Sequence, residues 1–196
     1  MIKVDMKLNR ELVVAVSGGV DSIAALDFLS RNHKVEVAFF NHGTETSTKA
    51  YDFVYDYCLK HNIDFRSGNS CREQFKWESK EEYWRQIRYE WLNALQGEIV
   101  TAHHLDDCVE TWIWSSLHGK PRLPKYKINN VVRPFLSTPK QKFIDWCGRN
   151  KVPYIEDETN EDIAFTRNYI RHVLMPHALQ VNPGLQKMVR KKLAGQ

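Results

Sequence analysis

The sequence predicts an α/β fold in which a parallel sheet is flanked by helices on both faces. Strand-like and helix-like patterns alternate from residue 11 to residue 117. The first strand-like runs are almost continuously apolar, as in strands that are buried on both faces. A short, mainly helical extension is expected after the sheet. We therefore expect one domain over 1–196, with a core at about 10–150 and a C-terminal segment at 151–196.

Each element follows from its own pattern. The runs typical of strands are "ELVVAV" (11–16), "VEVAFFN" (35–41), a weaker "IDFRS" (63–67), "EIVTA" (98–102) and "VVRPFL" (131–136). The helices are expected at 22–32, 47–61, 79–95, 105–117 and 139–150, and from about Pro183 to the C-terminal end. In the helix at 79–95, Tyr83, Ile87 and Trp91 recur on one face. Between 118 and 130, two prolines and four Lys or Arg side chains predict a basic loop.

Composition limits the class of protein. Hydrophobic residues make up 42% and charged residues 27%, which is typical of a globular protein. Because no apolar run is long enough to span a bilayer and the first residues lack a signal-peptide core, we expect a cytoplasmic protein without a membrane partner. The four cysteines form no CxxC pair, which disfavours a disulfide framework and a cysteine-based metal site. The net charge of +4 permits an anionic partner without requiring one.

The hexamer "SGGVDS" (17–22) joins a buried strand to a helix and is the first candidate site. Gly18 and Gly19 let the backbone approach an anion, and Ser17 and Ser22 add hydroxyl groups. The amides of the first helical turn, including that of Val20, would point at the same anion. A Walker A loop is excluded because no lysine follows in a GK[ST] arrangement. The alternative is a tight turn with an ordinary capped helix.

Polar side chains are expected along one edge of the sheet, where the parallel strands end. There the loop at 17–22 is joined by Asn41 with His42, and by His103 with His104. In the following "LDDCVET" helix, Asp107 and Glu110 share a face, as do Asp106 and Glu110. Successive residues of a strand point in opposite directions, so at most one of His103 and His104 is expected to meet a substrate. Acidic residues that simply favour the helix dipole are the alternative.

These segments resemble known families. "SGGVDS" resembles the pyrophosphate loop of the N-type ATP pyrophosphatases, and "TAHHLDDCVETWIW" resembles the HHxDDxxET signature of tRNA(Ile)-lysidine synthetases. "WRQIRYEWL", "VVRPFL" and "YIEDETNEDIAFTRNYIRHVLMP" are similar to later segments of that family, with Thr159 where serine is usual. The resemblance runs from about residue 12 to residue 184 with the motifs in order. It implies an adenine nucleotide alpha-hydrolase-like, Rossmann-like fold that uses ATP and Mg²⁺.

The resemblance also implies roles for particular residues. The implied catalytic residues are Asp21, Arg88, His103, Asp107 and Glu110. The implied ATP and pyrophosphate ligands are Ser17, Gly18, Gly19, Val20, Asp21, Ser22 and His42, with Asp21 also a candidate Mg²⁺ ligand. The candidate contacts to substrate or RNA are Arg85, Lys120, Arg122, Arg133, Arg167, Asn168 and Arg171. For Asn168, and for Asn160 beside Asp157, a loop-locking role is the favoured interpretation, whereas for Arg85 and the 120–127 segment a solvated surface is the alternative.

The implied reaction joins L-lysine to the wobble cytidine in the anticodon region of a tRNA(Ile) with a CAU anticodon. The cytosine C2 oxygen is adenylated, pyrophosphate leaves, and the lysine amine then displaces AMP. Asp107 or Glu110 would act as the general base or hold the lysine ammonium, and both options stay open. Two departures concern tRNA recognition: "HGTE" lacks an arginine that the family tends to have, and the chain stops where helical C-terminal domains usually begin. The alternatives are another enzyme of this fold with a different acceptor and a non-catalytic module that binds ATP or RNA.

Overall fold

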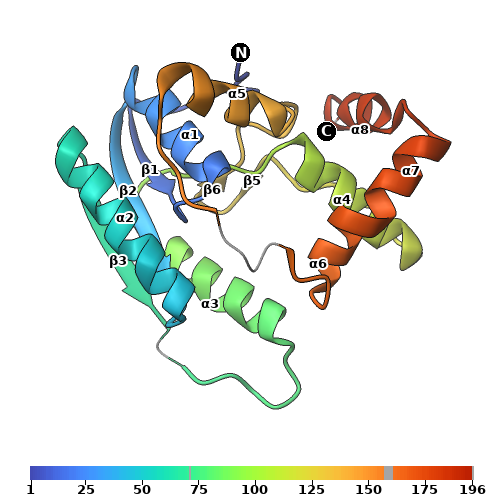
Figure 1. The fold of residues 1–196 in the computed structure, drawn as a ribbon, viewed down its shortest axis with the longest axis horizontal. Coiled ribbons are helices and arrows are strands. Elements are labelled where there is room, and N and C mark those ends of the chain that lie inside the picture. The colour runs from blue at the N-terminus through green and yellow to red at the C-terminus, as the bar shows by residue number, and fades with distance from the viewer. Residues whose placement is uncertain (71, 157–160, 196) are drawn as a thin grey trace.

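The computed structural model describes residues 1–70, 72–156 and 161–195, and its centre is a six-stranded sheet (Figure 1). The strands lie in the order β3-β2-β1-β4-β6-β5. Their bounds are β1 Glu11–Ala15, β2 Lys34–Asn41, β3 Asp64–Asn69, β4 Ile99–Thr101, β5 Lys127–Ile128 and β6 Val131–Val132. All neighbouring pairs are parallel except β5 with β6. The predicted parallel α/β sheet is therefore confirmed.

The strand β5 was not predicted, because its residues lie in the segment that the prolines and lysines mark as a loop. It forms a short antiparallel hairpin with β6, in which Ile128 pairs with Val131. The connecting turn is Asn129–Asn130, and Asn129 has φ 55. Asparagine tolerates this left-handed conformation, which two-residue hairpin turns require. A two-residue strand on the sheet edge is too short to show a periodicity.

Helices cover both faces of the sheet, as predicted. The helices are α1 Val20–Ser30, α2 Glu45–His61, α3 Lys80–Ala94, α4 Leu105–Leu117 and α5 Gln141–Asn150. On one face, α1, α2 and α5 enclose an apolar core that includes Phe39, Phe135 and Phe143. On the other face, α3 packs through Leu92 against Val131 and neighbouring strand residues. The helices on the two faces hold the sheet in place between them, and the candidate site lies at the edge where its parallel strands end.

The C-terminal segment contains more helix than the sequence predicts. A helical run passes through α6 (Thr166–Tyr169), the π-helical turn η2 (Ile170–Leu174) and α7 (Met175–Val181) before α8 (Leu185–Leu193). Only the last of these was expected, at about Pro183. The earlier run has no side-chain cap and few buried residues, so neither capping nor periodicity signals it. It lies beside α4 on one flank of the molecule (Figure 1).

The close approach of β3 to α3 gives a stability prediction. A Cβ atom built on Gly68 would lie 2.2 Å from the Trp91 ring, which is itself packed against Phe40 at 5.6 Å between centroids. Gly68→Ala should therefore lower the free energy of unfolding by about 1–3 kcal/mol, the usual cost of overpacking. Chemical denaturation would measure it.

Gly148 in α5 offers a matched control, since a Cβ atom there meets nothing within 4 Å. Gly148→Ala should raise stability by up to about 1 kcal/mol because alanine favours a helix. Equal stability of the two variants would contradict the packing argument.

Across the described ranges, no helix combines the length and the apolar character needed to cross a bilayer.

Candidate active site

The loop between β1 and α1 is a tight turn with its own hydrogen bonds. Gly18 has φ +90, which disfavours other residues, and its carbonyl accepts a bond from the Ile155 amide at 3.0 Å. The Ser22 hydroxyl donates to the Gly19 carbonyl at 3.0 Å and accepts from the Ser17 amide at 3.1 Å. The turn is thereby held open toward the carboxyl edge of the sheet. The first-turn amides of α1 have no acceptor inside the helix and suit an anion.

Asp21, in the first turn of α1, has one oxygen without a partner. Its Oδ2 lies 3.4 Å from Nε2 of His104. Its Oδ1 is buried, and none of the described residues forms a hydrogen bond with it. A buried carboxylate oxygen without a donor is costly unless a cation or another donor occupies that position. The position of Asp21 Oδ1 fits a ligand of Mg²⁺, because proteins hold this ion with one or two carboxylates plus substrate phosphates.

His104, which precedes the first turn of α4, lies close to three carboxylates. Its Nδ1 lies 3.5 Å from Asp107 Oδ2 and 3.7 Å from Asp106 Oδ2, and its Nε2 faces Asp21. Burial alone would lower the pKa of His104, but Asp107 and Asp21 outweigh burial and raise that pKa above 6.5. The neutral ring accepts from the Asp107 amide at 3.4 Å, whereas the protonated ring would face the carboxylates instead. The motifs predict His103 as the catalytic histidine; the structure adds His104, which faces both Asp21 and Asp107, while His103 also interacts electrostatically with Asp107.

The sequence around His104 has the pattern of a helix cap. His104 stands immediately before the helix, three residues ahead of Asp107. This is the spacing of a capping box, in which the backbone amide of His104 donates to Asp107 Oδ2 at 2.9 Å. A capping residue turns its ring toward the helix N-terminus, and here toward the neighbouring loop of Asp21.

Two arginines from the C-terminal run reach the carboxylates of α4. Arg167 donates from Nη2 to Asp107 Oδ1 at 2.9 Å and from Nε to Glu110 Oε2 at 3.1 Å. Arg171 donates from Nε to Glu110 Oε1 at 2.7 Å. Glu110 is only 2% exposed, and Asp107 is 8% exposed. Although burial alone would raise the pKa of Asp107, His104 and Arg167 hold that pKa well below its usual range.

His103 and His42 are neutral rings at the edge of this cluster. Burial, together with Arg133 and Arg167, lowers the pKa of His103 to about 3, and its Nδ1 is hydrogen-bonded to Thr101 Oγ1 at 2.9 Å. Burial and Arg88 lower the pKa of His42 to about 4. His42 lies between Phe40 and Trp84, with ring centroids 5.0 and 5.4 Å away. Its Nδ1 has no partner among the described residues.

Three of the predicted arginines surround Tyr89 on α3. The guanidinium carbons of Arg85, Arg88 and Arg133 lie 5.5–5.7 Å from its ring centroid. Burial lowers the pKa of Arg88, and Arg167, Arg85 and Arg133 add to this effect. Within the described part of the chain, no carboxylate forms an ion pair with Arg88. A half-buried cation among other cations suits an anion at this position.

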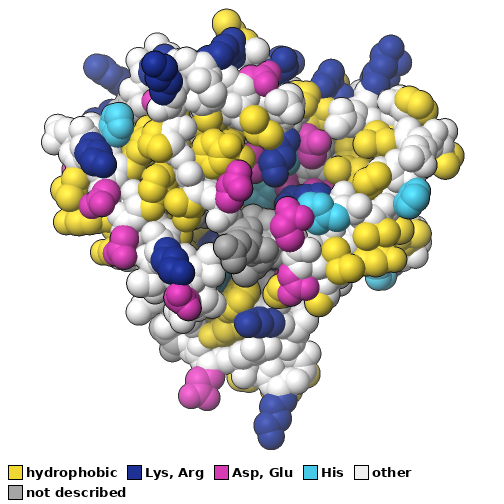
Figure 2. Space-filling model, viewed as in Figure 1, with side chains coloured by type: hydrophobic (Ala, Val, Ile, Leu, Met, Phe, Trp, Pro, Cys, Tyr) yellow, Lys and Arg dark blue, Asp and Glu magenta, His cyan; other side chains and the backbone are white. Residues whose placement is uncertain are grey.

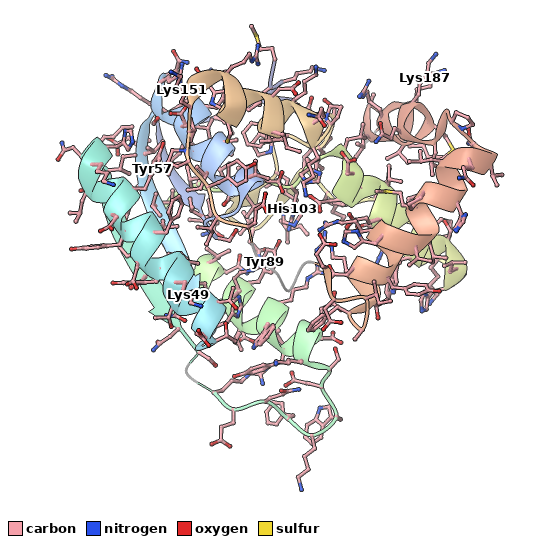
Figure 3. All side chains as sticks on the ribbon, viewed as in Figure 1. Lys49, Tyr57, Tyr89, His103, Lys151 and Lys187 are labelled. Atoms are coloured by element: carbon pink, nitrogen blue, oxygen red, sulfur yellow. The ribbon has the colours of Figure 1, made fainter. Side chains whose placement is uncertain are left out.

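Figure 2 shows acidic, basic and histidine side chains gathered near the centre of this face, beside the grey segment. In Figure 3, His103 and Tyr89 lie near the centre, whereas Lys151 and Lys187 lie at the periphery. The described residues contain no group of three or more His, Cys, Asp or Glu side chains arranged to hold a metal ion by themselves.

Other predicted residues lie elsewhere. Asp106 accepts from the Lys140 amide at 2.8 Å and from Gln186, so it joins α4 to the chain before α5 and to α8. Asn168 is buried, and its side-chain amide donates to the Asp162 carbonyl at 2.9 Å, which fits the favoured loop-locking interpretation. Lys120 and Arg122 are exposed in the loop after α4. The predictions for Asp157, Thr159 and Asn160 fall outside the described residues.

The three histidines give a prediction about pH. At pH 6.5 we expect His104 to be mostly protonated, because its pKa is raised above 6.5. We expect His42 and His103 to be neutral at that pH, because their pKa values are lowered. Imidazole ¹⁵N shifts, assigned with single His→Asn variants, would measure this. Because the folded pKa of His104 is raised, its contribution to stability is complete below pH 6.5 and is lost as pH rises through the folded pKa.

The unfolding free energy of the wild type minus that of His104→Asn should consequently shrink as pH rises above 6.5. If this difference grew with pH, burial rather than the carboxylates would set the direction in which the pKa of His104 shifts. His33, half-buried just before β2, provides the comparison, and His33→Asn is measured over the same pH range.

Sequence comparison identifies relatives that share these segments. Residues 2–178 match the PP-loop domain family. The chain is 33% identical over 185 residues to the tRNA(Ile)-lysidine synthase of Aster yellows witches'-broom phytoplasma, covering 88% of this chain and 42% of the relative. It is also 33% identical over 200 residues to the enzyme of that name from Lactiplantibacillus plantarum, covering 92% and 45%. The chain thus spans about half the length of these relatives. The resemblance predicted from the motifs is confirmed.

Solved structures agree on the fold. The U34-tRNA thiolase NcsA from Methanococcus maripaludis superposes with a TM-score of 0.78 at 15% identity, covering 97% of this chain and 72% of that one. The NH3-dependent NAD synthetase from Campylobacter jejuni superposes with a TM-score of 0.51 at 12% identity, covering 96% and 86%. Identities this low establish the shared architecture alone.

Proposed function

Because this chain belongs to the PP-loop domain family, we propose that it uses ATP to ligate lysine to the wobble cytidine of a tRNA with a CAU anticodon. The relatives named tRNA(Ile)-lysidine synthase support this assignment. The observation that carries it is the continuous series of charged contacts from Asp21 through His104 to Asp107, Glu110 and the two arginines. This series joins the loop at 17–22, which would bind the phosphates, to the buried acidic pair Asp107 and Glu110, which would bind the lysine. The proposed reaction needs both parts.

The ATP side of the site would be formed by β1, α1 and the end of β2. The amides at the start of α1, with the Ser17 and Ser22 hydroxyls, would bind the pyrophosphate that leaves. The adenine would lie at the end of β2, where the neutral His42 ring and Trp84 offer aromatic surfaces. The Nδ1 atom of His42 has no partner among the described residues and would form a hydrogen bond with the base, as donor or as acceptor. Lys and Arg are absent from the loop itself, so cations must come from other elements.

Mg²⁺ fits beside Asp21 because Oδ1 of that carboxylate is buried and lacks a partner among the described residues. When bound, the ion would neutralise charge on the phosphates. His104, whose pKa is raised, would orient Asp21 through the contact of Nε2 with Oδ2. His104 is thus proposed as a positioning residue.

The acceptor side of the site would be formed by Asp107 and Glu110. Since the pKa of Asp107 is lowered, this carboxylate is a weak proton acceptor at neutral pH and suits holding the lysine ammonium. Glu110 is bound on both oxygens by Arg167 and Arg171, so an incoming ammonium would have to displace or share these arginines. Arg167 is the more exposed of the two, with 40% of its side chain accessible, and we propose that it exchanges first.

The cation cluster at Tyr89 would bind a phosphate next to the reacting base. Arg88, half-buried and without a carboxylate partner in the described residues, would be an anion ligand there. Arg133 is fixed by a bond from Nη2 to the Tyr89 hydroxyl at 3.1 Å. The C2 oxygen of cytidine would attack the α-phosphorus as pyrophosphate leaves, and the lysine amine would then attack C2 as AMP leaves. An anticodon-loop base is already unpaired, which lowers the cost of exposing it.

The test incubates the protein with ATP, Mg²⁺, labelled lysine and a tRNA bearing a CAU anticodon. Mass analysis of the nucleosides should show a cytidine that has gained a lysyl group less water. Pyrophosphate release without lysine incorporation would indicate another acceptor. If neither product forms, the result contradicts an enzymatic role and favours a binding module.

A further inference from the structure

One part of the molecule contains many cations and no carboxylates. Residues 111–144 include seven Lys or Arg side chains and no Asp or Glu, and residues 163–196 include six and again none. The two segments are far apart in sequence but meet in the fold, because α8 packs against α4 through Leu185, Val189 and Leu193 (Figure 1). All acidic residues of the chain lie outside them. Sequence order alone does not place these cations together.

A groove of about 810 Å³ lies between α4, the loop before β6 and α8. We call it the α4–α8 groove, and its main lining side chains are Trp112, Arg122, Lys125, Tyr126, Lys127 and Lys192. Lys192 lies over the Trp112 ring, with Nζ 4.8 Å from the ring centroid. On the same loop, the guanidinium of Arg122 lies 5.4 Å from the Trp114 ring centroid. Two of the cations on or beside this surface therefore lie against aromatic rings.

The charge of the groove is not neutralised from within. In the described ranges, Arg122, Lys125, Lys127 and Lys192 form no ion pair. Carboxylates near its walls are used elsewhere. Asp5 accepts hydrogen bonds from the amide and hydroxyl of Ser137, and Asp106 binds the Lys140 amide and Gln186. The surface thus presents a net positive field to solvent.

A buried arginine connects the groove with the candidate active site. Arg133 is only 4% exposed, and its Nη1 donates to the Lys125 carbonyl at 3.1 Å. Its Nη2 donates to the hydroxyl of Tyr89, the residue that Arg88 also approaches.

We propose that the α4–α8 groove binds the sugar–phosphate backbone of the RNA whose base enters the active site. This inference rests on the proposed function. The four cations come from α8, from β5 and from the loop before β5, and none of them forms an ion pair within the described residues. Several unpaired cations on one surface suit a polyanion, and the neighbouring rings suit unpaired bases, which stack on aromatic surfaces. An acidic protein would not need the rings.

The experiment compares two triple variants with the wild type. Lys125, Lys127 and Lys192 are changed together to Glu in the first variant. In the control, Lys34, Lys60 and Lys151, which are exposed on β2, α2 and the end of α5, are changed together to Glu. Both variants change the net charge equally. Binding of a tRNA transcript with a CAU anticodon is measured by fluorescence anisotropy over a salt series, and ATP binding is measured in parallel as a readout of folding.

We expect the groove variant to bind the transcript at least about tenfold more weakly at 0.1 M salt, with a salt slope lower by about two or three. The control should stay within about twofold of the wild type, and both should bind ATP as the wild type does. Equal weakening in both variants, or none in either, would overturn the proposal. Tighter binding of a polyglutamate peptide than of the transcript would overturn it in favour of an acidic protein.

Lysine incorporation separates this proposal from the function on which it rests. If the wild type binds RNA through the groove but transfers no lysine, the proposed function fails and the groove assignment stands. If lysine transfer occurs and the groove variant retains it together with full RNA affinity, the groove assignment fails alone.

Discussion

Replacing Glu110 by Gln should lower the free energy of unfolding by about 2–3 kcal/mol and reduce turnover by on the order of 100-fold. Glu110 is 2% exposed and accepts from Arg167 and from two nitrogens of Arg171. Glutamine keeps the shape but removes one of the two carboxylates that the guanidinium groups share, and leaves them Asp107. The expected loss lies below the full cost of breaking a buried ion pair because both arginines are partly exposed. Urea denaturation and the lysine-incorporation assay would measure the two effects.

The same substitution at Glu11 is the matched control. Glu11 pairs with Lys34 at 3.3 Å, but both side chains are at least 70% exposed. Glu11→Gln should therefore change stability by no more than about 0.5 kcal/mol and leave turnover intact. If Glu110→Gln proved as mild as this control, the buried cluster would contribute little to either stability or catalysis.

Replacing Asp21 by Asn should abolish most pyrophosphate release, by a factor on the order of 100–1000, with unfolding free energy within about 1 kcal/mol of the wild type. The substitution removes the charge that would face Mg²⁺ and the phosphates, while the fold around α1 depends mainly on apolar contacts. Since Asp21 also raises the pKa of His104, the ¹⁵N titration of that ring should move to lower pH in the variant.

Asp27 provides the control on the same helix. It accepts from Arg31 at 2.9 Å and from the indole of Trp146 at 2.8 Å, away from the loop at 17–22. Asp27→Asn should cost about 1 kcal/mol of stability and keep pyrophosphate release within about twofold. Full activity of Asp21→Asn would remove that residue from the site.

The fold class followed from sequence because it depends on local pattern. Continuous apolar runs bounded by helical segments leave few arrangements other than a parallel sheet with helices on both faces. The helix at 105–117 was predicted with the bounds that α4 has in the structure, because its apolar periodicity and first-turn carboxylates agree. The strand β5 and the run from α6 to α7 were missed, since neither has a repeat or a cap strong enough to mark it.

Candidate site residues could also be named from the sequence. The family resemblance implied Asp21, Asp107 and Glu110, and the structure brings all three to one edge of the sheet. Their chemical roles stay predictions, because contacts in the protein alone do not show which group meets a substrate atom.

The partners of these residues depended on tertiary structure. The sequence suggested Arg167 and Arg171 for RNA or phosphate, yet they form ion pairs with carboxylates about 60 positions away in the chain. Similarly, His104 rather than His103 reaches Asp21, and the cations of the loop and of α8 line one groove. The sequence determined the elements and the chemical groups, because periodicity and spacing act within a few residues. Which groups face one another was decided by the packing of α4 against the C-terminal helices, because long-range contacts leave no local pattern.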